Sequence, residues 1–268
     1  MMEKDFRIIF ILTLFSVNLY SEAKHRLKNK DFGANIVGGK PVCAAKYPHS
    51  VLFFNAGSLC GGAILNSWAV ITSAHCIDYN TDINEMIVQV GSRHILDVNA
   101  KKYRLQWFLV HENYNKRIPF ENDIAILFVE HPIQFSKVVK KAILYGGPMS
   151  KKNLMMAKLK YVPLEECSRL HKMELSPDMF CLYGDGERDT CRGDSGGGVI
   201  WRRQLVGLTS HGDGCGKENK PSMYTNLWYH RDWIKMELAK FVIFYCQRLQ
   251  TKRISQNLTN KRCNLKSA

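Results

Sequence analysis

Short apolar or alternating runs, separated by turn-forming residues, constrain the fold of this chain more than any other feature. Gly, Asn, Asp and Pro punctuate the runs, which is typical of an all-β sandwich or barrel. The runs cover residues 50–54, 69–73, 86–90, 103–110, 124–129, 198–201, 204–210 and 222–227. Sustained helical periodicity occurs only near the end, from about residue 230 to 250. We therefore predict an all-β protein with one helix close to its C-terminus.

The N-terminus has the pattern of a signal peptide. Lys4 and Arg7 precede an apolar run over residues 8–17, and Ser21-Glu22-Ala23 is a small-x-small cleavage site. The run is shorter than a bilayer-spanning helix requires, so a membrane anchor is the weaker alternative. We predict a secreted, extracellular protein with no membrane span, a signal peptide at 1–23 and a polar, basic pro-segment at 24–35.

The number of cysteines and the distribution of basic residues give two further expectations. Nine cysteines in a secreted chain predict disulfides, and an odd number leaves at least one cysteine free or paired with another chain. The formal net charge is +14, and the last segment, 240–268, contains seven basic residues and no acidic one. This basic C-terminal extension is either a solvated tail or a contact site for polyanions or anionic surfaces.

The segment Gly193-Asp194-Ser195-Gly196-Gly197 is the strongest chemical motif. Its glycines allow a tight turn, in which the N–H groups of Gly193 and Ser195 can point at one oxygen atom. One such donor is typically worth about 2.7–4 kcal/mol in the transition state of acyl transfer. The alternative is a glycine-rich turn with an incidental serine. We predict that Ser195 is a nucleophile.

Two further motifs offer the partners that a serine nucleophile needs. His75 follows an apolar run, and Cys60 and Cys76 could close a loop that fixes it. Asp123 stands at the mouth of the apolar run 124–129. A lone histidine is more often structural, and such an aspartate is usually a strand-end cap. The order His, Asp, Ser nevertheless matches a known order for serine-dependent peptide hydrolysis.

On these motifs, residues 36 to about 237 resemble the trypsin-like serine protease family. The resemblance implies two antiparallel six-stranded β-barrels, an active site in the cleft between them, and a C-terminal helix. It implies a serine endopeptidase with the triad His75, Asp123 and Ser195 as general base, orienting group and nucleophile. Gly193 and Ser195 would supply the oxyanion hole. We expect the protease domain to span 36–239.

The family resemblance also implies a zymogen. Ile36-Val37-Gly38-Gly39 resembles the activated N-terminus of the family, in which the new ammonium group of Ile36 would pair with Asp194. Trypsin-type self-activation requires Lys or Arg before this position, whereas Asn35 stands here. A different activating protease is therefore expected to cleave the pro-segment.

Four residues would bind the substrate. Asp189 lies at the position that forms the floor of the specificity pocket, which implies cleavage after Lys or Arg; the alternative is an exposed loop aspartate. Ser210 and Gly212 would pair with the substrate strand, in a Ser-His-Gly segment where the family usually has Ser-Trp-Gly. Ser222 replaces the usual pocket-wall glycine and would narrow the pocket.

The resemblance implies three disulfides and one departure from the fold. The implied pairs are Cys60–Cys76, Cys167–Cys181 and Cys191–Cys215, with Cys43, Cys246 and Cys263 left over. The stretch between Asp123 and Cys167 is short by about two strands' worth of chain. We therefore expect the second barrel to be shortened.

We expect no cofactor and no metal site. The loop 91–102 has a single carboxylate, Asp97, which is too few for calcium, and the other histidines lack zinc-ligand spacing. Expected partners are protein or peptide substrates, an activating protease and protein protease inhibitors, with no specific nucleic acid. Two alternatives remain: a catalytically impaired homologue acting as an extracellular binding protein, favoured by the short stretch and Asn35, and a secreted binder acting through its basic tail.

Overall fold

The computed structural model describes residues 42–92, 94–95, 97–147, 159–184, 186 and 189–255. Five features of the sequence lie outside the described residues. They are the expected signal peptide and pro-segment, the activation residue Ile36, Cys263, and the end of the basic extension from 256 onward.

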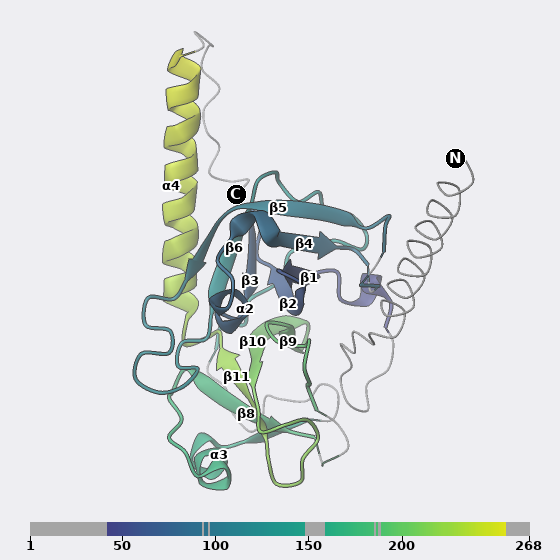
Figure 1. The fold of residues 1–268 in the computed structure, drawn as a ribbon, viewed down its shortest axis with the longest axis vertical. Coiled ribbons are helices and arrows are strands. Elements are labelled where there is room, and N and C mark those ends of the chain that lie inside the picture. Colours follow the sequence, from purple (N-terminus) through teal and green to yellow (C-terminus); the bar gives the residue numbers. More distant parts are fainter. Residues whose placement is uncertain are drawn as a thin grey trace, which may run out of the picture. The chain divides into compact units, whose positions relative to one another are not determined.

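Six antiparallel strands form a closed barrel, in the order β1-β2-β3-β6-β5-β4 (Figure 1). The strands are β1 (Ser50–Asn55), β2 (Ser58–Ile64), β3 (Ala69–Thr72), β4 (Met86–Val90), β5 (Lys101–Val110) and β6 (Ala125–Val129). The continuous apolar run of β6 has a simple cause, since the strand is buried on both faces. Leu127 points into the barrel core, whereas Ile126 and Phe128 join a second core outside the barrel.

Five strands form the second sheet, in the order β7-β8-β11-β10-β9. They are β7 (Lys160–Val162), β8 (Met179–Tyr183), β9 (Gly198–Trp201), β10 (Gln204–His211) and β11 (Ser222–Asn226). Between β6 and β7, the described residues 130–147 and 159 form only isolated bridges, Ser136 with Val139 and Leu144 with Leu205. The predicted all-β fold with a shortened second half is thus confirmed.

Short helices connect the strands, and one long helix ends the described chain. The short ones are η1 (Ala44–Lys46), α2 (His75–Asp78), η2 (Ile83–Glu85) and α3 (Leu164–His171). The long helix α4 (Arg231–Ser255) runs unbroken through residue 240, where the extension was expected to begin. None of the helices in the described residues is long and apolar enough to cross a bilayer.

Helix α4 docks on the first barrel through the residues that follow Lys240. Phe241 is 4% exposed and stacks on Phe128 of β6, with 4.1 Å between ring centroids. Tyr245, one turn further along, lies 4.7 Å from the ring of Trp68. These contacts show that the start of the extension is part of the folded body.

Replacing Phe241 by alanine should lower the free energy of unfolding by about 3–5 kcal/mol, because it empties a buried aromatic site between α4 and β6. Phe244 provides a matched control on the same helix, since its side chain is 54% exposed. Phe244→Ala should change stability by less than about 0.5 kcal/mol. Denaturant unfolding of the two variants measures both effects, and equal losses would contradict the docking of α4.

Candidate active site

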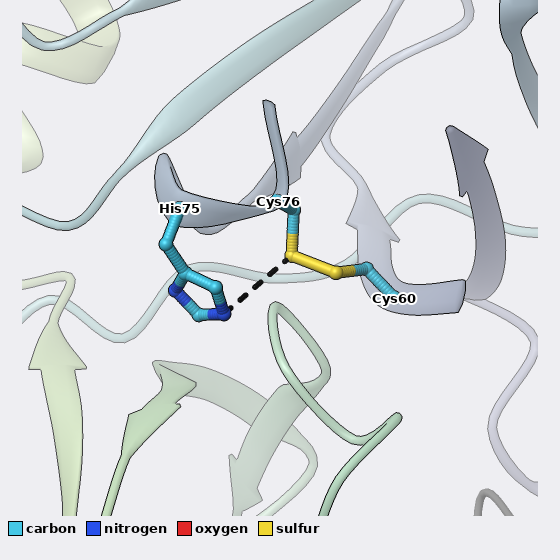
Figure 2. Close-up of side chains that lie close together, drawn as sticks. All are labelled: Cys60, His75 and Cys76. Carbon is cyan, nitrogen blue, oxygen red and sulfur yellow. Dashed lines mark hydrogen bonds between the residues drawn. A yellow bond between two sulfur atoms is a disulfide. The ribbon is translucent and has the colours of Figure 1, made fainter. Parts of the chain in front are cut away.

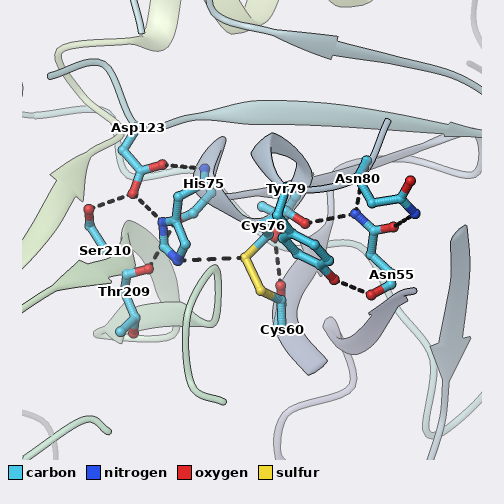
Figure 3. Close-up of a disulfide and its surroundings, with 12 residues drawn as sticks. Asn55, Cys60, His75, Cys76, Tyr79, Asn80, Asp123, Thr209 and Ser210 are labelled. Carbon is cyan, nitrogen blue, oxygen red and sulfur yellow. Dashed lines mark hydrogen bonds and ion pairs between the residues drawn. A yellow bond between two sulfur atoms is a disulfide. The ribbon is translucent and has the colours of Figure 1, made fainter. Parts of the chain in front are cut away.

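His75 is held by the two elements that meet at the N-terminus of α2. It lies three residues after the end of β3, and the Cys60–Cys76 disulfide ties the next residue to β2 (Figure 2). The buried side chain of Asn55 donates to the carbonyl oxygens of Cys76 and Asn80, at 3.0 and 2.9 Å (Figure 3). The main chain that carries His75 is therefore fixed from both sides.

Asp123 lies just before β6, is 1% exposed, and accepts three hydrogen bonds. Its Oδ2 accepts from His75 Nδ1 at 2.8 Å and from Ser210 Oγ at 2.5 Å. Its Oδ1 accepts from the His75 backbone N–H at 2.9 Å. Figure 3 shows the carboxylate aimed at the imidazole from the side opposite the disulfide. This arrangement fixes the proton of the neutral imidazole on Nδ1.

The electrostatics of this pair favour an ionised carboxylate. Burial lowers the pKa of His75, but the hydrogen bond and the charge of Asp123, with a further contribution from the charge of Asp78, raise it above the ordinary value of 6.5. Burial alone would raise the pKa of Asp123, and its hydrogen bonds from His75 and Ser210 outweigh that effect and lower it. Asp123 is thus charged at neutral pH, and a proton on His75 is stabilised.

Ser195 stands in a tight loop that packs against the first barrel. Gly196 has a φ of +74°, and a Cβ there would lie 2.2 Å from Thr72 Oγ1. The carbonyl oxygen of Ser195 accepts from the N–H of Gly61 at 2.6 Å. Glycine is required here both for its backbone conformation and for this close approach.

The backbone donors of this loop divide into two groups. The N–H groups of Asp194, Gly196 and Gly197 donate to carbonyl oxygens. Those of Gly193 and Ser195 donate to no group in the described part of the chain. Two unsatisfied N–H groups beside a serine can bind a negatively charged oxygen.

The Ser195 hydroxyl and His75 are not hydrogen-bonded in the described residues. The free ring nitrogen of His75, Nε2, lies 3.8 Å from the sulfur of Cys76 (Figure 2). The hydrogen bond between a nucleophile and its general base is often long or poorly aligned before substrate binds. The imidazole of His75 is therefore oriented by Asp123, but its Nε2 does not accept a hydrogen bond from Ser195.

Asp194 has no cationic partner in the described residues. It is partly buried, and its Oδ2 accepts from the Cys191 N–H at 2.8 Å. Burial raises the pKa of Asp194 to about 6; the hydrogen bond from Cys191 opposes this rise and the charge of Asp189 adds to it. A partly buried carboxylate without a counter-ion is stabilised in its charged form when a cation binds beside it.

Asp189 is buried at 4% exposure, so the exposed-loop alternative is wrong. Its oxygens accept from the N–H groups of Thr190 and Gly216, at 2.8 and 2.9 Å. Ser222 Oγ also donates to it, at 2.6 Å. Ser222 therefore occupies one lone pair of the Asp189 carboxylate.

His211 stacks on Phe120, with 4.2 Å between centroids and an angle of 13° between the rings. Phe120 in turn meets His75 edge to face at 5.8 Å. His211 Nδ1 lies 3.0 Å from Ser210 Oγ. Since the single Ser210 proton is donated to Asp123, the proton in this contact belongs to His211 Nδ1. Burial lowers the pKa of His211 to about 4, so the ring is neutral above that pH.

The structure contains the disulfides Cys60–Cys76, Cys167–Cys181 and Cys191–Cys215, which are the pairs that the resemblance implies. Cys246 is also disulfide-bonded, and Cys43 is free and exposed. In the described residues, one group of side chains has metal-ligand spacing: Cys60, His75 and Cys76. Its two sulfurs are joined to each other, so they offer no thiolates to a metal ion.

Three supporting residues escape sequence analysis. Asn55 looks like a turn residue at a strand end, and Phe120 like a loop aromatic. Asp178 is buried and accepts from the Asn122 N–H at 2.8 Å, which fixes the residue before Asp123. Each acts through contacts far apart in sequence, and only the polar character of Asn55 and Asp178 among apolar neighbours could have signalled a role.

The sequence pattern of the family described as Trypsin matches residues 36–234. The chain belongs to the trypsin family. It is a serine-type endopeptidase, a hydrolase whose substrates are proteins. The family assignment agrees with the closed barrel, the second sheet and the C-terminal helix. The alternative of an extracellular binding protein is not favoured.

Relatives of this trypsin-family chain include proteins named as trypsins and as transmembrane proteases. It is 27% identical over 265 residues to "Trypsin eta" of Drosophila melanogaster, covering 88% of this chain and 96% of the relative. It is 28% identical to "Trypsin" of Sus scrofa, covering 76% and 96%. It is 29% identical to "Transmembrane protease serine 11A" of Homo sapiens, covering 65% of this chain and 48% of that protein.

Proposed function

We propose that this endopeptidase is secreted as a zymogen and cleaves peptide bonds after Lys or Arg with the triad Ser195, His75 and Asp123. The observation that carries the proposal is the buried Asp123 carboxylate, which fixes His75 through Nδ1 and leaves Nε2 as the accepting nitrogen. Ser195 Oγ attacks the scissile carbonyl while Nε2 takes its proton, and the same proton passes to the leaving amine. Water then repeats the sequence on the acyl-enzyme.

The oxyanion of each tetrahedral intermediate would lie between the N–H groups of Gly193 and Ser195. Both groups are free of intramolecular acceptors in the described chain, which supports this role. The Asp123 charge stabilises the imidazolium that forms in the transition state, as the raised pKa of His75 indicates. The barrier is lowered because Asp123 stabilises the positive charge on His75 while the two N–H groups stabilise the negative charge on the oxyanion.

Activation would follow from the unpaired Asp194. Cleavage after Asn35 by another protease would free the ammonium group of Ile36, and Asp194 is a partly buried carboxylate with no cationic partner among the described residues. The loop from Gly193 to Ser195 flanks this carboxylate, so pairing at Asp194 would hold both oxyanion donors in position. The apolar run at 8–17 supports secretion.

Specificity for Lys and Arg would come from Asp189. Activated protein should cleave a Lys or Arg amide and leave a Phe amide intact, whereas Asp189→Ser should lower kcat/KM on the Lys and Arg amides by about 10²- to 10³-fold. The physical reason is that a buried cation left without its partner costs about 3–5 kcal/mol. Equal cleavage of Lys and Phe amides by the wild-type enzyme would contradict the assignment.

Ser222→Gly provides the matched variant at the same carboxylate. It removes the hydroxyl that donates to Asp189 and leaves the charge in place. We expect wild-type levels of cleavage after Lys and a higher Arg-to-Lys ratio of kcat/KM. Loss of activity toward both substrates would mean that Ser222 supports the fold rather than selects the substrate.

His211 is proposed as a positioning residue that acts through Ser210. Its Nδ1–H donates to Ser210 Oγ, whose proton is committed to Asp123. A hydrogen bond into the hydroxyl oxygen strengthens the bond that the hydroxyl donates. The chain from His211 to His75 therefore holds the orienting carboxylate in one position.

Two variants distinguish the role of the His211 Nδ1–H hydrogen bond from that of the ring stack on Phe120. His211→Phe keeps the stack on Phe120 and should lower kcat/KM by about 2- to 10-fold, the equivalent of one neutral hydrogen bond. It should also raise the pH of the acid limb of kcat/KM, because Asp123 then shares less of its charge with Ser210. His211→Asn restores a donor near Nδ1 and should restore the acid limb. Identical pH profiles for the two variants would contradict this role.

A further inference from the structure

Six exposed lysines from three separate segments gather at one end of the first barrel. They are Lys46, Lys101, Lys102, Lys137, Lys140 and Lys141, and we call them the lysine rim. The residues belong to η1, to the start of β5, and to the segment that follows β6.

Strand register places the first two groups together. Val90, the last residue of β4, pairs with Val51 of β1 on one side and with Lys101 of β5 on the other. The three strands thus begin or end at the same end of the barrel (Figure 1). Lys46 lies five residues before Val51, at this end.

Direct contacts add the third group. The N–H of Lys140 donates to the carbonyl oxygen of Pro48 at 2.8 Å, which joins the segment after β6 to the residues that follow η1. Lys101 Nζ donates to Gln134 Oε1 at 2.7 Å, which joins the same segment to β5. The three parts of the lysine rim therefore form one surface.

The charge of this surface is uncompensated. None of the six lysines forms an ion pair within the described residues, and the segments 44–50, 101–103 and 134–141 contain no acidic residue. Two acids lie within four residues of these segments. Asp97 is hydrogen-bonded to Ser92 within its own loop, and Glu130 lies beside Arg104, whose carbonyl oxygen accepts from its N–H at 3.0 Å. Elsewhere on the described surface, bases such as Arg117 and Lys217 are paired with carboxylates.

Exposed apolar side chains lie among these lysines. Phe135 follows Gln134, the partner of Lys101, and is 49% exposed. Val98, three residues before Lys101, is 87% exposed. An aromatic ring and an aliphatic side chain held at the surface beside cations gain stability when a partner covers them.

We propose that the lysine rim binds an acidic protein segment that also carries apolar side chains. The uncompensated charge would attract and orient such a segment, and Phe135 and Val98 would supply the contacts that slow its release. A sulfated polysaccharide would use the charge but would gain nothing from Phe135. The inference rests on surface residues alone and is independent of the proposed catalytic roles.

Binding of a labelled peptide of alternating glutamates and phenylalanines to the full-length Ser195→Ala protein tests the proposal. We expect fluorescence anisotropy to show binding that weakens as salt rises. Lys101→Glu combined with Lys102→Glu and Lys140→Glu should weaken binding by at least about tenfold. The matched control, Lys116→Glu with Lys160→Glu and Arg169→Glu, removes three exposed bases elsewhere that form no ion pair within the described residues, and it should change binding by less than about twofold.

A second probe, with each phenylalanine replaced by serine, identifies the partner class. It should bind several-fold more weakly to the parent protein, and Phe135→Ser should remove that difference. Equal loss in the two charge variants would show that only net charge matters. Equal affinity of the protein for both probes would show a general polyanion site and overturn the proposal. So would displacement of the peptide by heparin fragments at a concentration of negative charges lower than that of the peptide. The absence of binding to the parent protein would also overturn the proposal.

Discussion

Asp123→Asn should lower kcat/KM of the activated enzyme by about 10⁴-fold while leaving the protein folded. Asp123 accepts hydrogen bonds from His75 Nδ1, from the His75 backbone and from Ser210. An asparagine amide has one oxygen for these three donors, and its NH₂ group can face Nδ1 only if that nitrogen carries no proton. The imidazole proton then moves to Nε2, which can no longer accept the proton of Ser195.

The effect should be confined to catalysis. Asp232→Asn, which removes an exposed carboxylate from α4, is the control and should leave kcat/KM unchanged. Thermal unfolding of both variants shows whether the fold persists. A loss of less than about tenfold in a folded Asp123→Asn protein would show that Asp123 is not the orienting group of the base.

Asp194→Asn should have opposite effects before and after cleavage at Ile36. In the uncleaved chain the carboxyl group has a pKa of about 6, above its ordinary value of 3.8. A raised carboxyl pKa destabilises the fold progressively as pH rises from about 4 to 6, and fully above that range. Asp194→Asn should therefore raise the melting temperature of the uncleaved protein near neutral pH, with a difference that vanishes near pH 4.

After cleavage, the same substitution should lower kcat/KM by at least about 10²- to 10³-fold, the usual effect of losing one oxyanion donor. A cleavage sequence placed before Ile36 allows activation at will. Placing it one residue earlier, so that the new terminus is Asn35, gives a matched control with a misplaced ammonium group. If that control or cleaved Asp194→Asn is as active as the parent, the ion pair does not support the oxyanion hole.

Much of the fold is predictable because the strands carry their own local signal. The run at 86–90 coincides with β4, and the run at 198–201 with β9. Strands β2, β7 and β8 are missed. In β2 the reason is that Gly61 and Gly62 interrupt its apolar pattern. A Cβ on Gly61 would lie 2.6 Å from the Cα of Gly197, so the approach of the Ser195 loop requires glycine there.

In the candidate site, too, the residues in local motifs are predictable and the contacts between distant segments are not. Motifs within a few residues identify His75, Asp123, Ser195 and Asp189. The supporting contacts join distant segments, so no local pattern contains them: His211 with Phe120, Asn55 with Cys76, and Ser222 with Asp189. The docking of Phe241 is likewise absent from the sequence, because an apolar stretch at the end of a helix does not specify the surface that covers it.

Covalent labelling with a serine-directed phosphonate tests the central claim most directly. After cleavage at Ile36, mass spectrometry of the digested protein should show the label on Ser195 alone. His75→Ala protein should remain unlabelled, because the serine needs its base to react. A label on another residue, or equal labelling of Ser195 with and without His75, would contradict the account.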